Sequence, residues 1–381
     1  MDAFYGPLDL VMPYDVRGGG VGACTMSSLR RFAATWRETA TRRLFLREGV
    51  ELWLHELDPI WSLTEIRARV VDVVRETADV KTFVLRPNRR WHGHRAGQYT
   101  TIEVEINGVR VRRCYSISSS PADPRVAITV KRVPGGRVSS WLHDHVGAGD
   151  VIVLGAAAGD FVLPDHEPAQ LLLISAGSGI TPVMSIMRDL AARNAIRDVT
   201  FVHYAHSRAD VIFRAELDAL AGHHPGLRLL VHAVDEGGRF DEEGFARRVP
   251  DFAERATYLC GPPGLMARVE QLWDQAGAAL RSERFALPTV ASTTDSRLVR
   301  LRLARSDRAV AVTTTGTLLE QLERAGERPA SGCRIGICHT CKCRKRRGAV
   351  RNLLNGSISR EPDEDIQLCI SAPCSDIELD L

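Results

Sequence analysis

Four cysteines near the C-terminus constrain this 381-residue chain more than any other feature. Cys333, Cys338 and Cys341 stand at C-x4-C-x2-C spacing, and Cys369 follows 28 positions after the third. This spacing is typical of a [2Fe-2S] cluster, because short intervals make the chain wrap the inorganic core. Gly336 lies where a tight turn must point backbone amides at sulfur. A structural zinc site or reduced core cysteines are the alternatives, although zinc sites usually show paired C-x2-C units.

Length and composition set broader limits on the chain. A chain of this length predicts about two to four domains, and a net charge of +3 gives no indication of polyanion binding. No apolar run approaches the roughly 18 residues of a membrane span. The N-terminus lacks a basic region followed by an apolar core, so we expect a cytoplasmic protein without a transmembrane segment. Nine cysteines in a reducing compartment favour metal ligation over disulfides.

Residues 1–61 predict a helical N-terminal extension. Apolar residues and arginines are interspersed from residue 25 to residue 57. Such a stretch either lies on a membrane or a partner, or packs on the next domain with a solvated arginine face.

Short segments of alternating apolar and polar residues follow, which predicts a small antiparallel barrel over residues 62–164. The segments are 66–74, 80–85, 99–106, 109–117 and 126–133. Within the motif R-R-C-Y-S-I-S, Arg113 can fork two donors onto a phosphate, Tyr115 offers an aromatic face to a planar ring, and Ser116 offers a hydroxyl. A salt bridge beside a core aromatic residue is the alternative.

A second motif of the barrel is G-G-R-V-S-S at Gly135 to Ser140. Its glycines precede Val138 and Ser139, which open a short predicted helix. Free amides at a helix N-terminus favour a pyrophosphate. A strand turn with an ordinary helix cap would have the same pattern.

Alternating strands and helices over residues 165–288 predict a doubly wound parallel sheet. A buried strand at 171–175 leads into Gly177, Gly179, Thr181 and Pro182, followed by a helix over 182–192. Two glycines let the backbone approach a pyrophosphate, and the helix dipole favours the anion. G-x-G-x-x-P is incomplete as a dinucleotide motif, so its position between strand and helix carries the prediction.

The second strand of this sheet, at 199–204, ends where such folds contact the adenosine ribose. Ser207 and Arg208 suit a 2′-phosphate, which favours NADPH over NADH. Asp210 leaves a ribose hydroxyl, or an ion pair with Arg208, as the alternative. Cys260 stands at the carboxyl end of a fourth strand, where ligands bind, although a lone buried cysteine is often structural.

The last part of the chain predicts a short sheet that wraps one helix. A small polar stretch at 289–296 predicts a linker. Strands are expected at 298–303, 309–312 and 375–381, with a helix at 318–324. A basic run from Lys342 to Arg347 directly follows the cysteine loop. This run either docks an acidic acceptor protein or is a solvated loop.

Five motifs occur in an order that resembles one family. They are RRCYSIS, GG-x-VSSWLHD, ISAGSGITPVMS, YLCGPPGLM and CRIGICHTC. Over about residues 62–381, the chain resembles three-domain flavin reductases of the ferredoxin-NADP reductase superfamily with a C-terminal plant-type ferredoxin domain. The extension and residues 87–99 most resemble reductases that serve bacterial acyl-CoA or fatty-acid desaturases.

The resemblance implies an α/β and β multidomain fold, with an antiparallel β-barrel FAD domain (62–164), a doubly wound parallel-sheet NAD(P) domain (165–288) and a β-grasp ferredoxin domain (297–381). Residues implied to bind FAD are Arg113, Tyr115, Ser116, Gly136, Val138 and Ser139. Residues implied to bind the nicotinamide nucleotide are Gly177, Gly179, Thr181, Pro182, Ser207, Arg208, Cys260, Gly261 and Pro262. Cluster ligands would be Cys333, Cys338, Cys341 and Cys369, and catalytic residues Tyr115, Ser116 and Cys260.

The expected function is an NAD(P)H-dependent oxidoreductase that passes electrons from NADPH, with NADH as the second choice, through FAD and a [2Fe-2S] cluster. Its acceptor would be a non-haem iron desaturase or monooxygenase, and a membrane-bound acceptor would bring it to the periphery of the inner membrane. One alternative is the reductase component of a ring-hydroxylating or phenylacetyl-CoA-type oxygenase using NADH. The other is a non-catalytic iron-sulfur sensor that binds nucleic acid through the basic run, against which the flavin and nicotinamide motifs argue.

Overall fold

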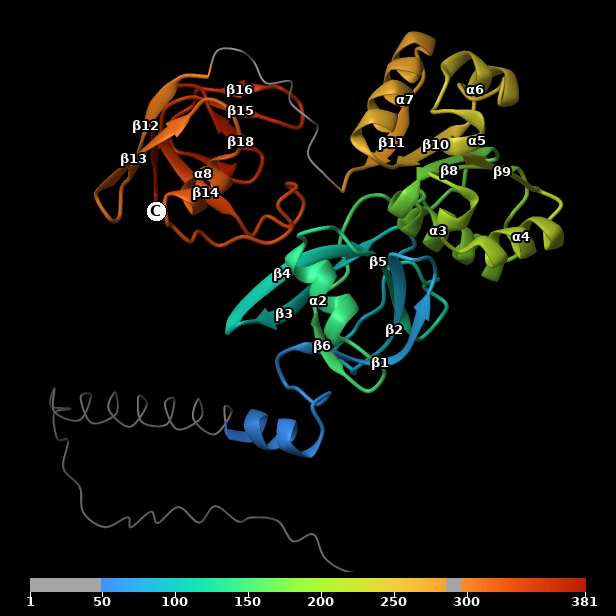
Figure 1. The fold of residues 1–381 in the computed structure, drawn as a ribbon, viewed down its shortest axis with the longest axis horizontal. Helices are drawn as coiled ribbons and strands as arrows, with labels where there is room; N and C mark the ends of the chain where they lie inside the picture. Colours follow the sequence, from blue (N-terminus) through green and yellow to red (C-terminus); the bar gives the residue numbers. More distant parts are fainter. Residues whose placement is uncertain (1–48, 286–295) are drawn as a thin grey trace, which may run out of the picture. The chain divides into compact units, whose positions relative to one another are not determined.

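The computed structural model describes residues 49–285 and 296–381. Most of the predicted N-terminal extension and of the predicted linker lies outside the described residues, and residues 49–57 of the extension are helical. The chain divides after Leu57, and Asp58–Leu381 forms one compact unit. Four sheets with separate strand sets, one of them small, build the unit that begins at Asp58 (Figure 1). The domain limits of the sequence analysis stay predictions.

The first sheet is antiparallel and curves into a barrel. Its strands are β1 (Ile66–Arg75), β2 (Val80–Pro87), β3 (Tyr99–Ile106), β4 (Val109–Ser116), β5 (Val126–Lys131) and β6 (Val151–Leu154), in the order β4-β3-β6-β1-β2-β5. A bridge between Ile117 and Ile128 joins the end of β4 to β5. Side chains alternate along these strands, so one face fills the barrel with fully buried residues such as Phe83 and Ile102. Helix α2 (Arg137–His145) contributes the buried Leu142 to the same core.

The second sheet is parallel. Its strands are β7 (Leu171–Ala176), β8 (Val199–Ala205), β9 (Leu227–Ala233), β10 (Ala256–Cys260) and β11 (Leu280–Glu283), in the order β11-β10-β7-β8-β9. Its helical segments are η1 (Gly177–Gly179), α3 (Ile180–Ala192), η2 (Arg208–Asp210), α4 (Arg214–His223), α5 (Val234–Gly237), α6 (Glu242–Arg248) and α7 (Pro263–Ala276). Figure 1 shows α3 and α4 on one side of the sheet and α6 and α7 on the other.

Alternation along β7 explains the two helical layers. Leu171 and Leu173 join the core that includes α3, whereas Leu172 and Ile174 join the core that includes α7. Both faces are therefore covered, as parallel sheets require. Helix α3 begins at Ile180, two residues earlier than predicted, so Pro182 lies inside the first turn. Proline is tolerated there because amides of the first turn have no intrahelical acceptor.

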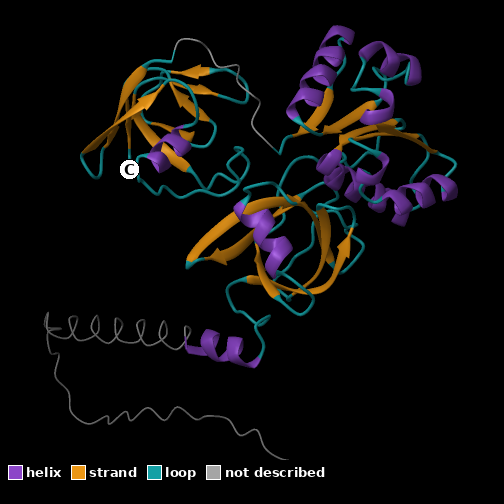
Figure 2. Ribbon diagram, viewed as in Figure 1, coloured by secondary structure: helices purple, strands orange, loops and turns teal. Residues whose placement is uncertain are grey.

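The third sheet is mixed and packs on one helix. Its five strands follow the order β13-β12-β19-β14-β17, with β12 parallel to β19. They are β12 (Leu298–Leu303), β13 (Arg308–Thr313), β14 (Lys342–Arg347), β17 (Glu364–Gln367) and β19 (Ile377–Leu379). A small sheet contains β15 (Val350–Asn352), β16 (Ile358–Ser359) and β18 (Ser371–Pro373), and the helix is α8 (Leu318–Arg324). Figure 2 shows the long loop that joins α8 to β14.

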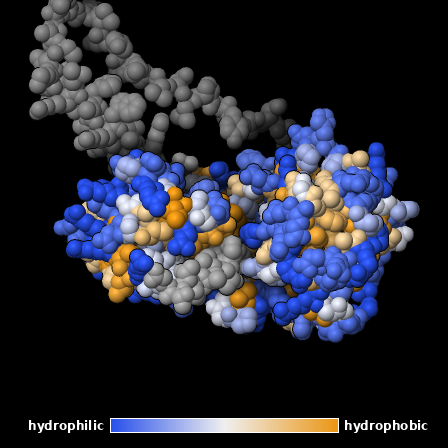
Figure 3. Space-filling view, turned by 90° about the horizontal axis from the view of Figure 1, so that it is seen from above, coloured by the Kyte–Doolittle hydropathy of each residue, from blue (hydrophilic) through white to orange (hydrophobic). Residues whose placement is uncertain are grey.

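The basic run of the sequence is therefore a strand, β14, and not a solvated loop. The strands β6, β11 and β14 to β18 were not predicted individually. Hydrophilic residues cover most of the face seen in Figure 3. Among the residues that the structure describes, no helix is both long and apolar enough to cross a membrane.

Candidate functional site

The end of strand β4 brings together the first group of predicted residues. Ser116 is buried, and Arg113 and Tyr115 are half-buried. Burial lowers the pKa of the Arg113 guanidinium, and the nearby guanidinium groups of Arg334 and Arg137 lower it further. Arg334 is itself paired with Glu323 at 2.5 Å, so Arg113 and Arg137 are the cationic groups here that suit a bound phosphate.

The N-terminus of α2 is shaped for close approach by an anion. Gly136 precedes the first turn and provides no side-chain cap. A Cβ atom at Gly136 would lie 2.6 Å from Ser139 Oγ and 2.9 Å from the Val133 carbonyl oxygen. Ser139 Oγ accepts a hydrogen bond from the Val133 amide at 3.2 Å, so its own proton stays available for a ligand. The first-turn amides, Val138 included, fit a pyrophosphate.

The predicted nucleotide loop packs against the end of strand β10. A Cβ atom at Gly179 would lie 2.2 Å from the Cys260 carbonyl oxygen, so only glycine fits. Gly177 has φ +52° and open space where a side chain would point, which leaves the backbone free to meet a ligand. Thr181 Oγ1 donates to the Ser178 carbonyl at 3.0 Å and steadies the turn.

The motif after β10 completes this loop. Cys260 ends β10, and Gly261 contacts the loop because it lies 2.8 Å from the position of a Gly179 Cβ atom. Pro262 precedes helix α7. The predicted nucleotide residues 177–182 and 260–262 therefore meet at the carboxyl edge of the parallel sheet, where ligands bind in such folds.

Glu283, which the sequence analysis missed, lies beside this edge. It ends β11 in register with Cys260, and its carboxylate accepts a hydrogen bond from Ser116 Oγ at 3.3 Å. The residue is partly exposed, but desolvation of its carboxyl raises the pKa of Glu283 to about 8, against a smaller lowering by Ser116. Burial raises the pKa of the Cys260 thiol, and the nearby Glu283 carboxyl raises it further. Both groups are therefore mainly neutral at pH 7.

A polar row continues across the sheet from Cys260. Ser175 pairs with Cys260 on one side and with His203 on the other. Ser175 Oγ and His203 Nδ1 are 2.8 Å apart, and both residues are fully buried. Burial lowers the pKa of His203 to about 4, so its ring is neutral.

Ser207 and Arg208, predicted to hold a 2′-phosphate, both have partners in the structure. Ser207 Oγ donates to Asp210 at 2.6 Å, and Arg208 Nε donates to Glu236 at 2.7 Å. The alternative ion pair between Arg208 and Asp210 is not formed. Arg208 and Glu236 are exposed and line a cavity of about 250 Å³ together with His232. A 2′-phosphate would compete with Glu236 for Arg208.

The predicted cluster loop turns its amides toward sulfur. Cys333 Sγ accepts from the amides of Ile335 at 3.4 Å and Cys338 at 3.3 Å, and Cys338 Sγ accepts from the Cys333 amide at 3.1 Å. Gly336 has φ +88°, and a Cβ atom there would meet Ile370 at 2.9 Å. Amide donors of this kind stabilise the negative charge on cluster thiolates, so the loop fits such a group.

The four predicted ligands converge. Hydrogen bonds from Cys114, Cys338 and Cys369 lower the pKa of the Cys333 thiol. A hydrogen bond with Cys369 lowers the pKa of Cys341 to about 7.

A zinc ion and a [2Fe-2S] cluster need different arrangements of their cysteine ligands. Within residues 49–285 and 296–381, no three His, Cys, Asp or Glu side chains have the arrangement for one metal ion. A zinc ion would need its four ligands around one centre. In a [2Fe-2S] cluster held by four cysteines each iron takes two, so the ligands surround two centres.

The barrel contacts this loop through adjacent strands. Tyr99 on β3 donates its hydroxyl to the Ile337 carbonyl at 3.1 Å, and Arg113 donates to the Gly332 carbonyl at 3.2 Å. Hydrogen bonds with Cys333 and Cys338 raise the pKa of the Cys114 thiol. Neither Tyr99 nor Cys114 could be identified from the sequence, because their partners lie more than 200 positions away along the chain.

The basic strand β14 is largely neutralised inside its own domain. Lys342 pairs with Asp365 at 3.0 Å, and Arg346 pairs with Asp380 at 2.5 Å. Lys345 is fully buried. This finding weakens both hypotheses that use the run as a free cationic surface, for an acidic acceptor or for nucleic acid.

Three family models match successive parts of the chain. They are an oxidoreductase FAD-binding domain over residues 67–163, an oxidoreductase NAD-binding domain over 173–271 and a 2Fe-2S iron-sulfur cluster binding domain over 301–374. Their order agrees with the order of the three larger sheets along the chain.

Whole proteins of known kind are also similar. An NADPH oxidoreductase of Mycobacterium tuberculosis is 40% identical over 336 residues, which cover 86% of this chain and 88% of the relative. The glycine betaine monooxygenase reductase subunit of Chromohalobacter salexigens is 32% identical, covering 84% and 96%. The solved structure of phthalate dioxygenase reductase matches with a TM-score of 0.61 at 24% identity, covering 84% of this chain and 98% of that one, and so supports the fold.

Fold and site together define an oxidoreductase with FAD-binding, NAD-binding and [2Fe-2S] domains. The chain belongs to the three-domain flavin reductases of the ferredoxin-NADP reductase superfamily that carry a C-terminal plant-type ferredoxin domain. Its relatives include reductase components of oxygenases.

Proposed function

We propose that this protein takes electrons from NADPH and delivers them, through FAD and its [2Fe-2S] cluster, to a non-haem iron oxygenase or desaturase. One observation carries the proposal: residues of β4 face both neighbouring sites. Ser116 meets Glu283 beside the nucleotide loop. Arg113 and Cys114 meet the cysteine loop.

The chain's own residues hold and insulate these groups. Arg113 and the amides that follow Gly136 would bind the FAD pyrophosphate, and Tyr115 would lie against the flavin ring. When bound, FAD supplies the step from two-electron to one-electron transfer, and the cluster carries single electrons. Ser116 Oγ donates a hydrogen bond to Glu283 Oε2, and Cys260 and Glu283, both mainly neutral at pH 7, would keep fixed charge away from a bound nicotinamide.

Arg208 and Ser207 would select NADPH. An arginine in this position suits a 2′-phosphate, and a relative named NADPH oxidoreductase supports the assignment. Replacing Arg208 by Ala should weaken binding of NADPH and leave binding of NADH nearly unchanged. Arg214→Ala is the control, because Arg214 is an exposed arginine paired within α4 to Asp218. If Arg208→Ala binds NADPH as tightly as wild type does, and NADH as tightly as wild type does, the assignment is wrong.

The acceptor is proposed at two levels. Relatives named as reductase subunits of oxygenases support a non-haem iron oxygenase, and the extension with residues 87–99 favours a desaturase within that group. A soluble ring-hydroxylating oxygenase with NADH as donor is the second candidate. We propose a cytoplasmic location. If the acceptor is membrane-bound, the protein would work at the surface of the inner membrane. Reconstitution with a purified membrane desaturase and with a soluble oxygenase separates the candidates by product formation.

The internal electron path is tested by anaerobic titration of the purified protein with NADPH. Visible spectra should show bleaching of both flavin and cluster bands. A colourless protein, or flavin bands that NADPH does not bleach, would contradict the proposed path. Rapid reduction of an artificial one-electron acceptor would exclude the non-catalytic sensor.

A further inference from the structure

Helix α3 carries two polar side chains that reach the barrel. Ser185 Oγ donates to the Ser119 carbonyl at 2.7 Å, and Arg188 Nη1 donates to the Ser118 carbonyl at 2.6 Å. Ser185 is fully buried. Both stand on the helix face that begins at Thr181, because residues four and seven positions apart share one face. One face of α3 therefore runs from the nucleotide loop to the barrel.

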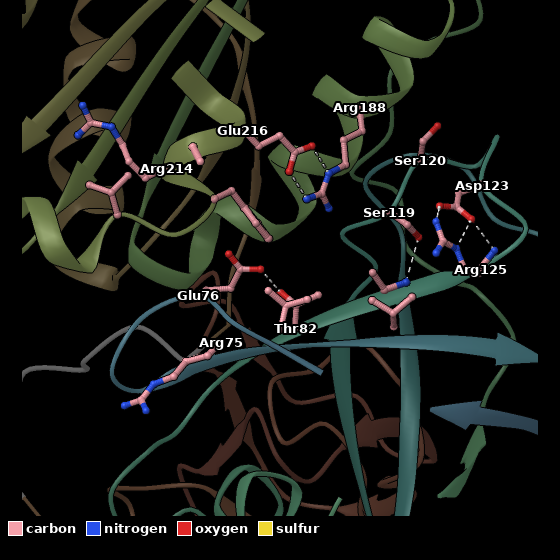
Figure 4. Close-up of a pocket in the computed structure, with 16 residues that line it drawn as sticks. Arg75, Glu76, Thr82, Ser119, Ser120, Asp123, Arg125, Arg188, Arg214 and Glu216 are labelled. Carbon is pink, nitrogen blue, oxygen red and sulfur yellow. Dashed lines mark hydrogen bonds and ion pairs between the residues drawn. The ribbon is translucent and has the colours of Figure 1, made fainter. Parts of the chain in front are cut away.

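Arg188 is held on several sides. Its Nε and Nη2 atoms donate to the two carboxylate oxygens of Glu216 at 2.8 and 2.6 Å. Its guanidinium lies 4.5 Å above the ring centre of Phe213. Figure 4 shows the Arg188 and Glu216 pair at the edge of a cavity of about 770 Å³. A forked ion pair and a stacked ring fix the plane of the guanidinium, so the remaining nitrogen points at Ser118 in a fixed direction.

The barrel side of this contact is also rigid. Ser118 is fully buried, and its amide donates to the Ala127 carbonyl at 2.8 Å. Its hydroxyl lies 3.0 Å from Thr129 Oγ1. Ser118 follows Ser116 by two residues, so a shift of Ser118 must move the end of β4. Barrel residues such as Phe161 share a hydrophobic core with α3, which keeps the two surfaces together.

We propose that Arg188 is a positioning residue for hydride transfer. It joins the end of the flavin-binding strand to the helix that begins at the nucleotide loop, and so sets how closely the two rings approach. The proposal rests on the proposed placement of FAD at residues 113–116 and of the nicotinamide at 177–182. Arg188 changes no bond: the hydride passes with its electron pair from the nicotinamide, which is oxidised, to the flavin, which is reduced.

The test is rapid anaerobic mixing of the full-length, FAD- and cluster-loaded protein with NADPH and with NADPH deuterated at the transferred position. Misplacement by about 1 Å can cost on the order of a hundredfold in rate. Arg188→Met should therefore reduce the flavin at least about tenfold more slowly, with a larger deuterium isotope effect and an NADPH dissociation constant within about twofold of wild type. Arg188→Lys keeps the charge without the fork and should recover part of the rate.

Arg193→Met is the matched control. Arg193 directly follows α3 and pairs with Asp189 at 2.8 Å, but it makes no hydrogen bond to the barrel strands. It should keep the wild-type rate and isotope effect. If Arg188→Met reduces the flavin as fast as wild type, or if Arg193→Met loses as much, the proposal is wrong.

A second variant protects the test from misfolding. Glu216→Gln leaves Arg188 facing Ser118 but loosens its fork, so it should lose rate in the same direction by a smaller factor. An unchanged rate in a well-folded Glu216→Gln protein with full FAD content contradicts the proposal. Failure of the proposed function would give a different result: in the wild-type protein, the flavin would stay oxidised after NADPH is added.

Discussion

The Glu283 carboxyl connects protonation to folding. Its pKa rises from an ordinary 4.5 to about 8 in the folded protein, mainly through desolvation. Between these values the folded state binds a proton that the unfolded state releases. Its stabilising contribution is therefore complete below pH 4.5 and is lost as the pH rises through 8, by at most about 1.4 kcal/mol per pH unit.

Glu283→Gln should remove this part of the pH dependence. An amide can still accept a hydrogen bond from Ser116, and it carries no charge at any pH. The free energy of unfolding of the variant, relative to wild type, should increase steadily from pH 5 to pH 8.5 in urea unfolding. The exposed Glu254→Gln is the control and should follow wild type. Parallel curves for wild type and Glu283→Gln would show that the carboxyl ionises normally.

Single residues were predictable where a motif carried them. The four cysteines and Gly179 could be proposed from the sequence, because the spacing of the cysteines is typical of an inorganic core and Gly179 stands in a motif that requires close backbone contact. Glu283 and Arg188 could not, because their partners Ser116 and Ser118 are 167 and 70 positions away. Only the folded chain brings such pairs together.

At the scale of elements, β14 shows how a lysine can belong to a core. Lys345 points inward, where its ammonium donates to the carbonyls of Gly348 at 3.1 Å and Glu361 at 2.6 Å and pairs with Glu364 at 3.3 Å. These contacts tie β14 to the turn that follows it and to the segment before β17.

Lys345→Met should destabilise the ferredoxin domain by on the order of 3 kcal/mol, because two carbonyls and a carboxylate lose their partner. The measurement is denaturant unfolding followed by cluster absorbance. Arg347→Met, at the exposed end of the same strand, should change the free energy of unfolding by less than about 0.5 kcal/mol. Similar losses in both variants would mean that charge alone, rather than burial, accounts for the effect.

Elements with a regular apolar pattern were predictable, and elements without one were not. Residues 99–106, 298–303 and 318–324 agree with the structure at both ends. β14 was missed because Lys345 at an inward position hides its alternation. β11 was missed because Arg281, Ser282 and Glu283 read as a polar loop, although pairing with β10 makes them a strand.

At the scale of the whole molecule, the ferredoxin domain has a hydrophobic core of its own. Buried residues such as Leu301, Leu318 and Ile377 form one cluster with no member from the barrel or the parallel sheet. The order of the domains was predictable from the order of the motifs. Contacts between the barrel and its neighbours were not, because no motif encodes them.

Removal of the cluster should therefore affect one part of the protein. Metal ligation contributes directly to folding where its ligands form the site, so acid-and-chelator treatment should lower the unfolding temperature of the ferredoxin domain. The FAD- and nucleotide-binding part should keep its transition and its reduction of flavin by NADPH. Calorimetry of treated and untreated protein gives both transitions, and a single transition lowered as a whole would contradict separate cores.

The neutralised strand beside the cluster bears on how an acceptor finds this protein. Alternating positive and negative side chains a few ångströms apart cancel beyond roughly one Debye length, about 8 Å at physiological ionic strength. Collisions with the acceptor would then be guided little by distant charge. The acceptor would be selected after encounter, by the shape and packing of the surface over the cysteine loop. The rate of productive encounter would change little between low and high salt.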